Sequence, residues 1–379
     1  MDFSLSKTEE LFLQMIRSFA QNEVKPLAAE VDEEERFPAE TVEKMAKLGL
    51  LGIPFPKEYG GAGGSNALYS MAVEELARVC ATTAVIVSAH TSLCVNPIYE
   101  FGTEDQRQKY LPKLCSGEWL GAFGLTEPNA GTDAAGQQTT AVLEGDHYVL
   151  NGSKIFITNA AAAHVFVVMA MTDRSQGTRG ISAFIVTRDM KGFSVGKEEL
   201  KMGIRGSATC ELIFEDCIVP KENLLGREGK GFSIAMKTLD GGRIGIASQA
   251  LGIAQGAIDE TVEYVKTRKQ FGRALAKFQN TAFQLADMDT RTQAARYLVR
   301  AAAWKKDHKL PYSKDASYAK LFAAETAMEV TTKAVQLYGG YGYTRDYPVE
   351  RMMRDAKITE IYEGTSEVQR MVISAHLLK

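Results

Sequence analysis

The spacing of apolar residues changes twice along the chain, and this change constrains the fold more than any other feature of the sequence. Residues 1–120, and the residues after Gly231, repeat apolar side chains at helical spacing, whereas the segment between them carries short or alternating apolar runs broken by turns. The chain of 379 residues is long enough for two or three packed domains. We therefore predict an α+β multidomain protein with an N-terminal α-helical domain (1–120), a middle β-barrel or sandwich domain (121–231) and a C-terminal four-helix bundle (232–379).

Capping signals and apolar repeats predict where the helices lie. Ser6 with Glu9, and Thr103 with Gln106, have the spacing of capping boxes at helix starts. The stretch 81–99 carries too much Thr, Ser, His and Asn to span a bilayer, and we predict a buried helix there. After Gly231 the apolar repeats predict further helices over residues 232–268, 278–308, 312–338 and 366–378.

Strand-like runs are confined to the middle of the chain. Apolar runs at 165–169, 181–186 and 211–214 predict three strands. Asn151-Gly152 stands between two more strand-like runs, and this dipeptide is a strong signal of a two-residue hairpin turn. We therefore predict a hairpin that turns at Asn151-Gly152.

Charge and cysteine content exclude several classes of function. The net charge of −3 provides no basic field for nucleic acid. The five cysteines form no C-x-x-C pair and the five histidines are scattered, so we expect no metal site, no disulfide framework and a cytoplasmic location. The N-terminus lacks the regions of a signal peptide, and no apolar run is long enough to cross a membrane. The glycine motifs of Rossmann domains and phosphate-binding loops are absent.

Five segments of the chain resemble the acyl-CoA dehydrogenase family. They stand in the family's order and spacing and together extend over essentially the whole chain, at residues 125–133, 155–159, 268–272, 336–343 and 354–366. Within the family the chain most resembles the short-chain branch, the butyryl-CoA dehydrogenases of anaerobic bacteria. The resemblance implies the family's three-domain fold, an FAD cofactor and the α,β-dehydrogenation of short-chain acyl-CoA, with butyryl-CoA converted to crotonyl-CoA.

Glu363, in Tyr362-Glu-Gly-Thr-Ser366, matches the family's catalytic base. The α-proton of a thioester is weakly acidic, so its removal needs an adjacent base and a stabilised enolate oxygen. The resemblance implies that Glu363 abstracts this proton, that its backbone N–H helps to hold the thioester oxygen, and that flavin N5 takes the β-hydrogen as hydride. Isovaleryl- and long-chain relatives carry the base on the long helix instead. The matching position here is Gly242, which has no side chain to act as a base.

The resemblance also implies which residues contact the cofactor and the substrate. Positions that match the family's FAD contacts are Phe123, Leu125, Thr126, Gly131, Thr132, Phe156, Thr158, Arg268, Phe271, Gln279, Gln336, Leu337, Gly339, Gly340, Thr365 and Glu367. Positions that match acyl-CoA contacts are Thr132, Asp240, Arg243, Tyr362 and Gly364. The contacts at 268–279 and 336–340 match those that a neighbouring subunit contributes, so we expect a homotetramer built as a dimer of dimers. Asp240 and Arg243 also have the spacing of a structural ion pair on a helix, and that interpretation stays open.

Three interpretations of function follow. The first is a short-chain dehydrogenase that passes electrons to an electron-transferring flavoprotein, with short branched or medium-chain acyl-CoA as alternative substrates. The second is an acyl-CoA oxidase that reduces O₂, and the third is a non-catalytic flavoprotein. The 85–97 helix, which we expect at the end of the acyl cavity, holds no Lys or Arg, which disfavours a dicarboxylyl substrate. Ala160-Ala161 stands where most relatives have Gly-Gly, and alanine is strained there if the turn needs a positive φ.

Overall fold

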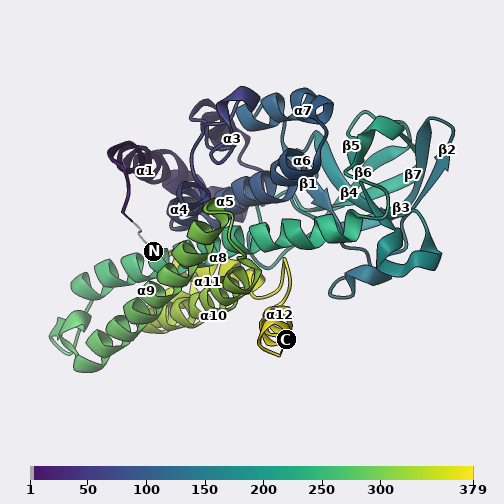
Figure 1. Cartoon of the computed structure of the whole chain (residues 1–379). Coiled ribbons are helices and arrows are strands. Elements are labelled where there is room, and N and C mark those ends of the chain that lie inside the picture. The colour runs from purple at the N-terminus through teal and green to yellow at the C-terminus, as the bar shows by residue number, and fades with distance from the viewer. Residues whose placement is uncertain (1–3, 379) are drawn as a thin grey trace.

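The computed structural model describes residues 4–378, and its elements follow the predicted order of helices, sheet and helices (Figure 1). The predicted fold class is confirmed: a helical N-terminal part and the long C-terminal helices lie on either side of α8, and the sheet lies at one end of the molecule. Residues 1–3, at the start of the predicted first domain, and residue 379, at the end of the predicted last domain, lie outside the described residues. None of the helices within 4–378 is long and apolar enough to cross a membrane.

Both predicted capping boxes are present in the N-terminal part. Glu9 N donates to Ser6 Oγ at 3.3 Å and Ser6 N donates to Glu9 Oε2 at 2.9 Å, so α1 begins at Lys7. The same pair of bonds joins Thr103 and Gln106 at the start of α7. The helices of this part are α1 (Lys7–Phe19), α2 (Ala28–Glu33), α3 (Ala39–Lys47), α4 (Asn66–Ala77), α5 (Ala81–Ser88), α6 (Asn96–Phe101) and α7 (Glu104–Ser116).

The predicted buried helix over 81–99 is confirmed. Between α5 and α6 the chain stays helical but widens to a π-helix over Ala89–Val95, so the three pieces form one helical rod. Every residue from Ala81 to Ile98 is buried. This rod packs against both β1 and α8, and it therefore lies at the junction of the three parts of the fold.

The middle of the chain folds into one eight-stranded sheet with the order β6-β7-β3-β2-β4-β5-β8, and β1 pairs in parallel with β4 off this path. The fully buried β4 has a hydrophobic cluster on each face: Phe166, Val168 and Ala170 pack in the core of the β domain, and the alternate residues Val165, Val167 and Met169 pack in a cluster shared with the helices. The strands are β1 (Gly121–Gly124), β2 (Thr140–Glu144), β3 (His147–Ile157), β4 (Val165–Met171), β5 (Ile181–Thr187), β6 (Phe193–Glu198), β7 (Cys210–Pro220) and β8 (Leu224–Leu225).

The predicted hairpin at Asn151-Gly152 is wrong. β3 runs through both residues, and the chain turns earlier, at Gly145 and Asp146 between β2 and β3. The step from Leu150 to Gly152 on β3 lies opposite a longer step from Phe214 to Cys217 on β7, so β7 carries a β-bulge there. Gly152 has a φ of 139°, and a Cβ on it would lie 2.7 Å from Thr139 Oγ1, so this position needs glycine for space as well as for backbone conformation.

Five helices make up the C-terminal part, and four of them match the predicted ranges within one residue at most ends. They are α8 (Gly231–Thr267), α9 (Gln279–Asp307), α10 (Ser313–Tyr338), α11 (Val349–Thr359) and α12 (Ser366–Leu377), of which α11 was not predicted. Two short strands, β9 (Lys269–Gln270) and β10 (Arg273–Ala274), form the turn between α8 and α9. Helix α8 runs from the sheet to this turn, and α9 and α10 lie along its far half (Figure 1).

Candidate active site

Glu363 lies in the short turn that joins α11 to α12. Its φ is 53°, in the left-handed region that a residue with a side chain rarely adopts. The Oε2 atom of its carboxyl group is buried and has no hydrogen-bond partner within the described chain. Burial raises the pKa of Glu363 to about 8, and the positive charges of Lys320 and Arg243 oppose this rise. A buried, unpartnered carboxyl group with this pKa has the properties of a general base.

The backbone of α8 contacts this carboxyl group directly. A Cβ added at Gly242 would lie closer than 3.0 Å to Glu363 Oε2 and 2.8 Å from Leu93 Cδ2. Leu93 belongs to the buried rod 81–101, so the carboxyl group lies where α8, that rod and the α11–α12 turn meet. Gly242 is the position that matches the alternative base of some relatives, and the structure brings it into contact with Glu363.

Tyr362 and Thr365 flank Glu363 and Gly364 in the chain, and both anchor the turn. Tyr362 donates a hydrogen bond from its hydroxyl group to Gln249 Oε1 on α8, and Gln249 in turn donates to the carbonyl of Ala81 at 3.0 Å. Thr365 Oγ1 accepts from Val368 N at 3.3 Å and caps the start of α12. Glu367 is exposed in the first turn of that helix. The turn is therefore tied both to the rod and to its own helix.

Asp240 and Arg243 form the ion pair that their spacing allowed. Arg243 Nη1 donates to Asp240 Oδ1 at 2.6 Å, and Ser313 Oγ donates to the same oxygen at 2.9 Å. Only 6% of the Arg243 side chain and 21% of the Asp240 side chain are exposed. Arg243 Nε is buried without a partner within residues 4–378, so the pair leaves polar capacity for a ligand beside Glu363. A structural role and a substrate role are thus compatible for these two residues.

The loop after β1 and the end of β3 form the sheet side of the site. Phe123 lies on β1, and the carbonyl of Thr126 accepts from Ile155 N at 2.9 Å, which ties the loop to β3. The side chain of Phe156 is 60% exposed, and its φ is 59°. Leu125 is buried, Thr158 is partly buried, and Gly131 and Thr132 are exposed in the loop. The structure therefore places the loop after β1 beside the end of β3 that carries the exposed ring of Phe156.

The turn after Thr158 contains one left-handed residue, and it is neither alanine of Ala160-Ala161. Asn159 takes a φ of 67°, and its Nδ2 donates to the carbonyl of Ile86 at 3.0 Å. Asparagine tolerates this conformation better than most residues with a side chain. The replacement of Gly-Gly by two alanines therefore causes no backbone strain of the kind considered from the sequence.

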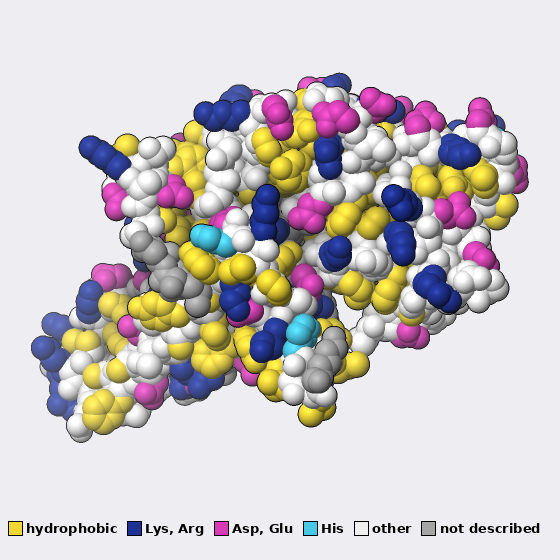
Figure 2. Space-filling model, in the orientation of Figure 1, with side chains coloured by type: hydrophobic (Ala, Val, Ile, Leu, Met, Phe, Trp, Pro, Cys, Tyr) yellow, Lys and Arg dark blue, Asp and Glu magenta, His cyan; other side chains and the backbone are white. Residues whose placement is uncertain are grey.

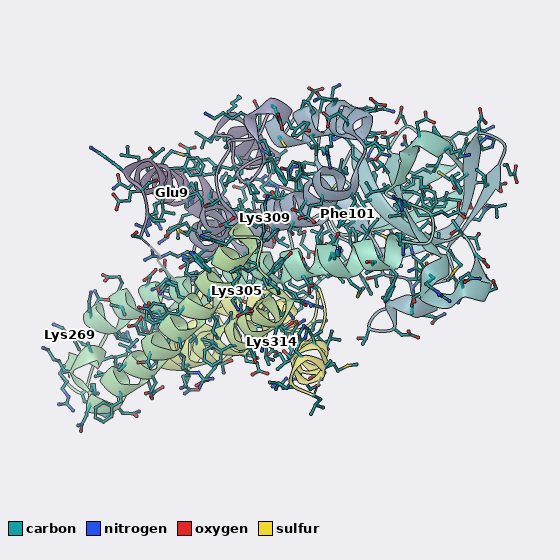
Figure 3. All side chains as sticks on the ribbon, viewed as in Figure 1. Glu9, Phe101, Lys269, Lys305, Lys309 and Lys314 are labelled. Atoms are coloured by element: carbon teal, nitrogen blue, oxygen red, sulfur yellow. The ribbon has the colours of Figure 1, made fainter. Side chains whose placement is uncertain are left out.

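The remaining predicted FAD contacts lie at the opposite end of the molecule. A surface pocket of about 460 Å³ is lined by Arg268, Gln336, Leu337, Gly339 and Gly340 together with neighbouring residues. Phe271, in the adjacent β9–β10 turn, is 94% exposed, and Gln279 begins α9 beside it. Lys269 marks this end of the helical arm in Figure 3, far from the sheet, and Lys and Arg side chains gather there in Figure 2.

The sheet-side residues and the arm residues each fit only one part of a flavin dinucleotide. The sheet side offers an exposed aromatic ring beside an open loop, which suits the flat face of a flavin. The arm offers Arg268, and its glycines 339 and 340 have no atom within 4 Å of an added Cβ, so an adenosine diphosphate group has space there. One chain does not bring these two groups of residues together.

Buried polar residues that were not predicted from the sequence support this site. Lys320, Gln369 and Gln249 are each fully buried beside the α11–α12 turn. A signal existed for Lys320, because it interrupts an apolar stripe formed by Ala316, Ala319, Ala323 and Ala327 on α10. A charged residue on such a stripe indicates a buried charge that needs a partner.

Comparisons with known proteins match almost the whole chain. The N-terminal, middle and C-terminal domains described for acyl-CoA dehydrogenases match residues 6–118, 122–217 and 229–378. A short-chain specific acyl-CoA dehydrogenase of Clostridium acetobutylicum is 67% identical over 379 residues, which is 100% of each chain. The solved butyryl-CoA dehydrogenase of Megasphaera elsdenii is 54% identical over 100% of each chain, with a TM-score of 0.98. A chain from a structural study of the electron transferring flavoprotein of Acidaminococcus fermentans and flavin-based electron bifurcation is 57% identical over 100% of each chain, with a TM-score of 0.99.

Proposed function

The chain belongs to the acyl-CoA dehydrogenase family, and from this premise we propose that it oxidises short-chain acyl-CoA, with butyryl-CoA converted to crotonyl-CoA and FAD as the cofactor. The observation that carries the proposal is the buried, unpartnered Oε2 of Glu363 at the junction of α8, the buried rod and the α11–α12 turn. A free carboxylate oxygen aimed at an enclosed junction is the group that proton abstraction from a thioester requires.

The residues of the chain divide the chemistry between them. Glu363 removes the α-proton of the acyl group. Burial raises the pKa of Glu363, which brings it closer to the pKa of the weakly acidic α-carbon. The backbone N–H of Glu363 holds the thioester oxygen on which charge develops. Bound FAD supplies the acceptor for the hydride that leaves the β-carbon. Arg243 and Asp240 bind the pantetheine and acyl part of the substrate, and Tyr362, Gly364 and Thr132 complete that contact.

FAD is held by two chains in this proposal. Phe123, Leu125, Thr126, Phe156 and Thr158, with Gly131 and Thr132, line the flavin, and Thr365 and Glu367 at the start of α12 contact the pyrophosphate and ribose. The partner subunit contributes its copies of the arm residues around Arg268 and the 336–340 loop. The assembly that follows is a homotetramer built as a dimer of dimers, in which the three domains span residues 1–120, 121–231 and 232–379.

The electron acceptor in this proposal is an electron-transferring flavoprotein, which the similarity to the chain from the Acidaminococcus fermentans study supports. The cysteines at 80, 94, 115, 210 and 217 are all unpaired and buried, which suits a reducing cytoplasm. Within residues 4–378 no group of three or more His, Cys, Asp or Glu side chains is placed to hold a metal ion.

The test is anaerobic reduction of the bound flavin, followed as bleaching of its absorbance, with acyl-CoAs of increasing length and branching. We expect butyryl-CoA to bleach the wild-type protein fastest. Glu363→Gln keeps the shape of the side chain but removes the base, so it should bind FAD and acyl-CoA and lose a factor of about 10²–10⁴ in the reduction rate. The matched control is Glu360→Gln, which changes an acid of the same turn whose partner is the surface residue Lys357.

Each alternative has a distinct outcome in this experiment. Retained flavin reduction by Glu363→Gln would place the base elsewhere. Faster bleaching with an eight-carbon or branched acyl-CoA would contradict the short-chain assignment. Rapid peroxide formation in air would identify an oxidase, and a flavin that no acyl-CoA bleaches would identify a non-catalytic flavoprotein.

A further inference from the structure

Lys320 has an environment that is unusual for a lysine. Its side chain is fully buried on α10, and the stripe on which it lies is otherwise formed by small apolar residues such as Ala316, Ala319 and Ala323. Burying an ammonium group costs free energy unless nearby groups compensate for the lost hydration. The contacts of this ammonium group therefore indicate what it does.

The ammonium group is directed at the turn that carries Glu363. Lys320 Nζ donates to the carbonyl oxygen of Gly364 at 2.7 Å, and this is the one hydrogen bond that it makes within the described chain. Gln369 Nε2, from α12, donates to the same oxygen at 2.8 Å. Two buried donors from two helices thus hold the carbonyl group of Gly364, the residue that follows Glu363.

This double contact coincides with a strained backbone. Glu363 has a φ of 53°, and such a conformation persists only where the surrounding structure holds it. Lys320 and Gln369 hold the peptide unit between Gly364 and Thr365. Their hydrogen bonds therefore limit how far the backbone of the turn can move. The backbone N–H and the carboxyl group of Glu363 both depend on this conformation for their direction.

Lys320 is also the positive charge near Glu363 that no carboxylate neutralises directly. The charged groups that act on Glu363 are Lys320 from α10 and Arg243 from α8, and Arg243 is already paired with Asp240. Among residues 4–378 no carboxylate lies within 4.0 Å of Lys320 Nζ, although Glu360 and Glu367 act on it from a greater distance. Burial lowers the pKa of Lys320, and the charge of Glu363 opposes this change.

We propose that Lys320 is a positioning residue for the base: it holds the carbonyl of Gly364, which keeps Glu363 in its left-handed conformation, and its charge favours the ionised carboxylate. This inference rests on the proposed role of Glu363. Gln369 shares the first task, because it donates to the same carbonyl, but it carries no charge. The two tasks are therefore separable by experiment.

The experiment compares Lys320→Met with Gln369→Leu in the FAD-loaded protein, using the rate of flavin reduction by butyryl-CoA as a function of pH. The base acts when it is ionised, so the rate rises with pH through the pKa of Glu363. Loss of the Lys320 charge raises that pKa, and the rising limb should move to higher pH by about one unit. Lys320→Met should also lower the maximal rate by about tenfold, whereas Gln369→Leu should lower the rate without moving the limb.

Lys333→Met is the matched control, since it removes another lysine from α10 whose partner is the partly exposed Glu329. If Lys320→Met does not retain FAD, Lys320→Gln replaces it, because this variant keeps a donor for the carbonyl of Gly364 and lacks the charge; the same shift is expected. The inference would be overturned if the rising limb of the pH–rate profile stayed at the wild-type pH in the Lys320 variant. Equal shifts of the limb in the Lys320 and Gln369 variants would overturn it as well. Flavin reduction by Glu363→Gln would instead overturn the proposed function, whatever the Lys320 variants do.

Discussion

The contact between Gly242 and Glu363 decides the geometry of the base at the scale of single residues. The carboxyl group lies against the backbone of α8, at a place where any side chain at position 242 would overlap it. Leu93 Cδ2 would lie 2.8 Å from a Cβ added at Gly242, so a side chain at position 242 would meet two neighbouring side chains at once. A side chain here would displace the carboxyl group, and glycine leaves the base in its observed position.

Gly242→Ala should displace the carboxyl group and slow flavin reduction by about 10²-fold, because a misplacement of about 1 Å has this effect on a catalytic group. FAD binding should stay near the wild-type level, since Gly242 was not assigned to the cofactor site. Stopped-flow reduction by butyryl-CoA measures the first effect and absorbance titration the second.

Gly241→Ala is the control for this substitution. Its added Cβ would meet the flexible end of Lys306 at 3.0 Å and no atom of Glu363, so the reduction rate should change by less than about twofold. Equal losses in the two variants would mean that helix α8 as a whole, and not the carboxyl group, is disturbed.

At the scale of elements, a buried ion pair fastens the loop after β1 to β3. Lys154 Nζ lies 2.7 Å from Glu127 Oε1, and the two side chains are 0% and 5% exposed. Lys154 also donates to the carbonyl of Leu125 at 3.2 Å, and Glu127 accepts from Thr139 N at 3.0 Å. This pair of charges is therefore one of the attachments that hold the loop that carries Leu125, Thr126 and Thr132.

Lys154→Met should leave the carboxylate of Glu127 buried without its partner and destabilise the protein by about 3–5 kcal/mol. FAD affinity should fall as well, because the loop loses one of its attachments to β3 and keeps the backbone bond between Ile155 N and the carbonyl of Thr126. Adding Glu127→Gln to Lys154→Met removes the lone charge but keeps an acceptor for Thr139 N, so part of the stability should return. Thermal unfolding with and without FAD checks both expectations; a double variant that is no more stable than Lys154→Met would contradict the explanation.

The sequence predicted elements well where local signals decide and poorly where distant contacts decide. The capping boxes and long helices followed from residues close together in the chain. At Asn151-Gly152 the local signal was misleading: a hairpin turn of this type needs two residues with positive φ, but only Gly152 has one, and Asn151 Oδ1 accepts from Asp216 N at 2.8 Å on β7. Helix α11 had a usable signal in Val349, Met352 and Ala356, which are buried at helical spacing.

The candidate site shows the same division. Glu363 was identified because its role matches a contiguous motif, and Gly242 because the family offers an alternative position for the base. Lys320, Gln369 and Gln249 were missed because each acts on the α11–α12 turn from a different helix. A lysine within a helix normally indicates a solvated surface, and for Lys320 the one contrary signal in the sequence is the alanine stripe that it interrupts on α10.

At the scale of the whole molecule, the two groups of proposed FAD contacts lie at opposite ends of one chain. The sheet-side residues lie on β1, the loop after it and the end of β3, whereas Arg268 and the 336–340 loop line a pocket on the arm, whose end Lys269 marks in Figure 3. A site shared between chains is the arrangement that lets both groups contact one cofactor. Activity should therefore depend on combinations of chains as well as on each chain.

Co-expression of Glu363→Gln with Arg268→Glu tests this dependence. Each variant alone should be inactive, but a mixed dimer has one site with both defects and one site with none. Random pairing makes half of the dimers mixed, so about a quarter of the wild-type activity should return. Activity per flavin after separation of differently tagged chains provides the measurement.

The control pairs Arg268→Glu with Phe271→Asp, two changes on the same arm, because every site in that mixed dimer carries one defect and no activity should return. Failure of the first pair to exceed the sum of its separate variants would show that each chain holds its cofactor alone.

The mutual exclusion of Gly242 and Glu363 also bears on how such a protein can evolve. A base on α8 and a base in the α11–α12 turn would meet in the same space, so a chain can hold both only if one carboxyl group moves. Moving the base takes two substitutions at positions far apart in the sequence. An intermediate with both acids must displace one of them and an intermediate with neither lacks the base, so we expect lineages to exchange the two positions rarely.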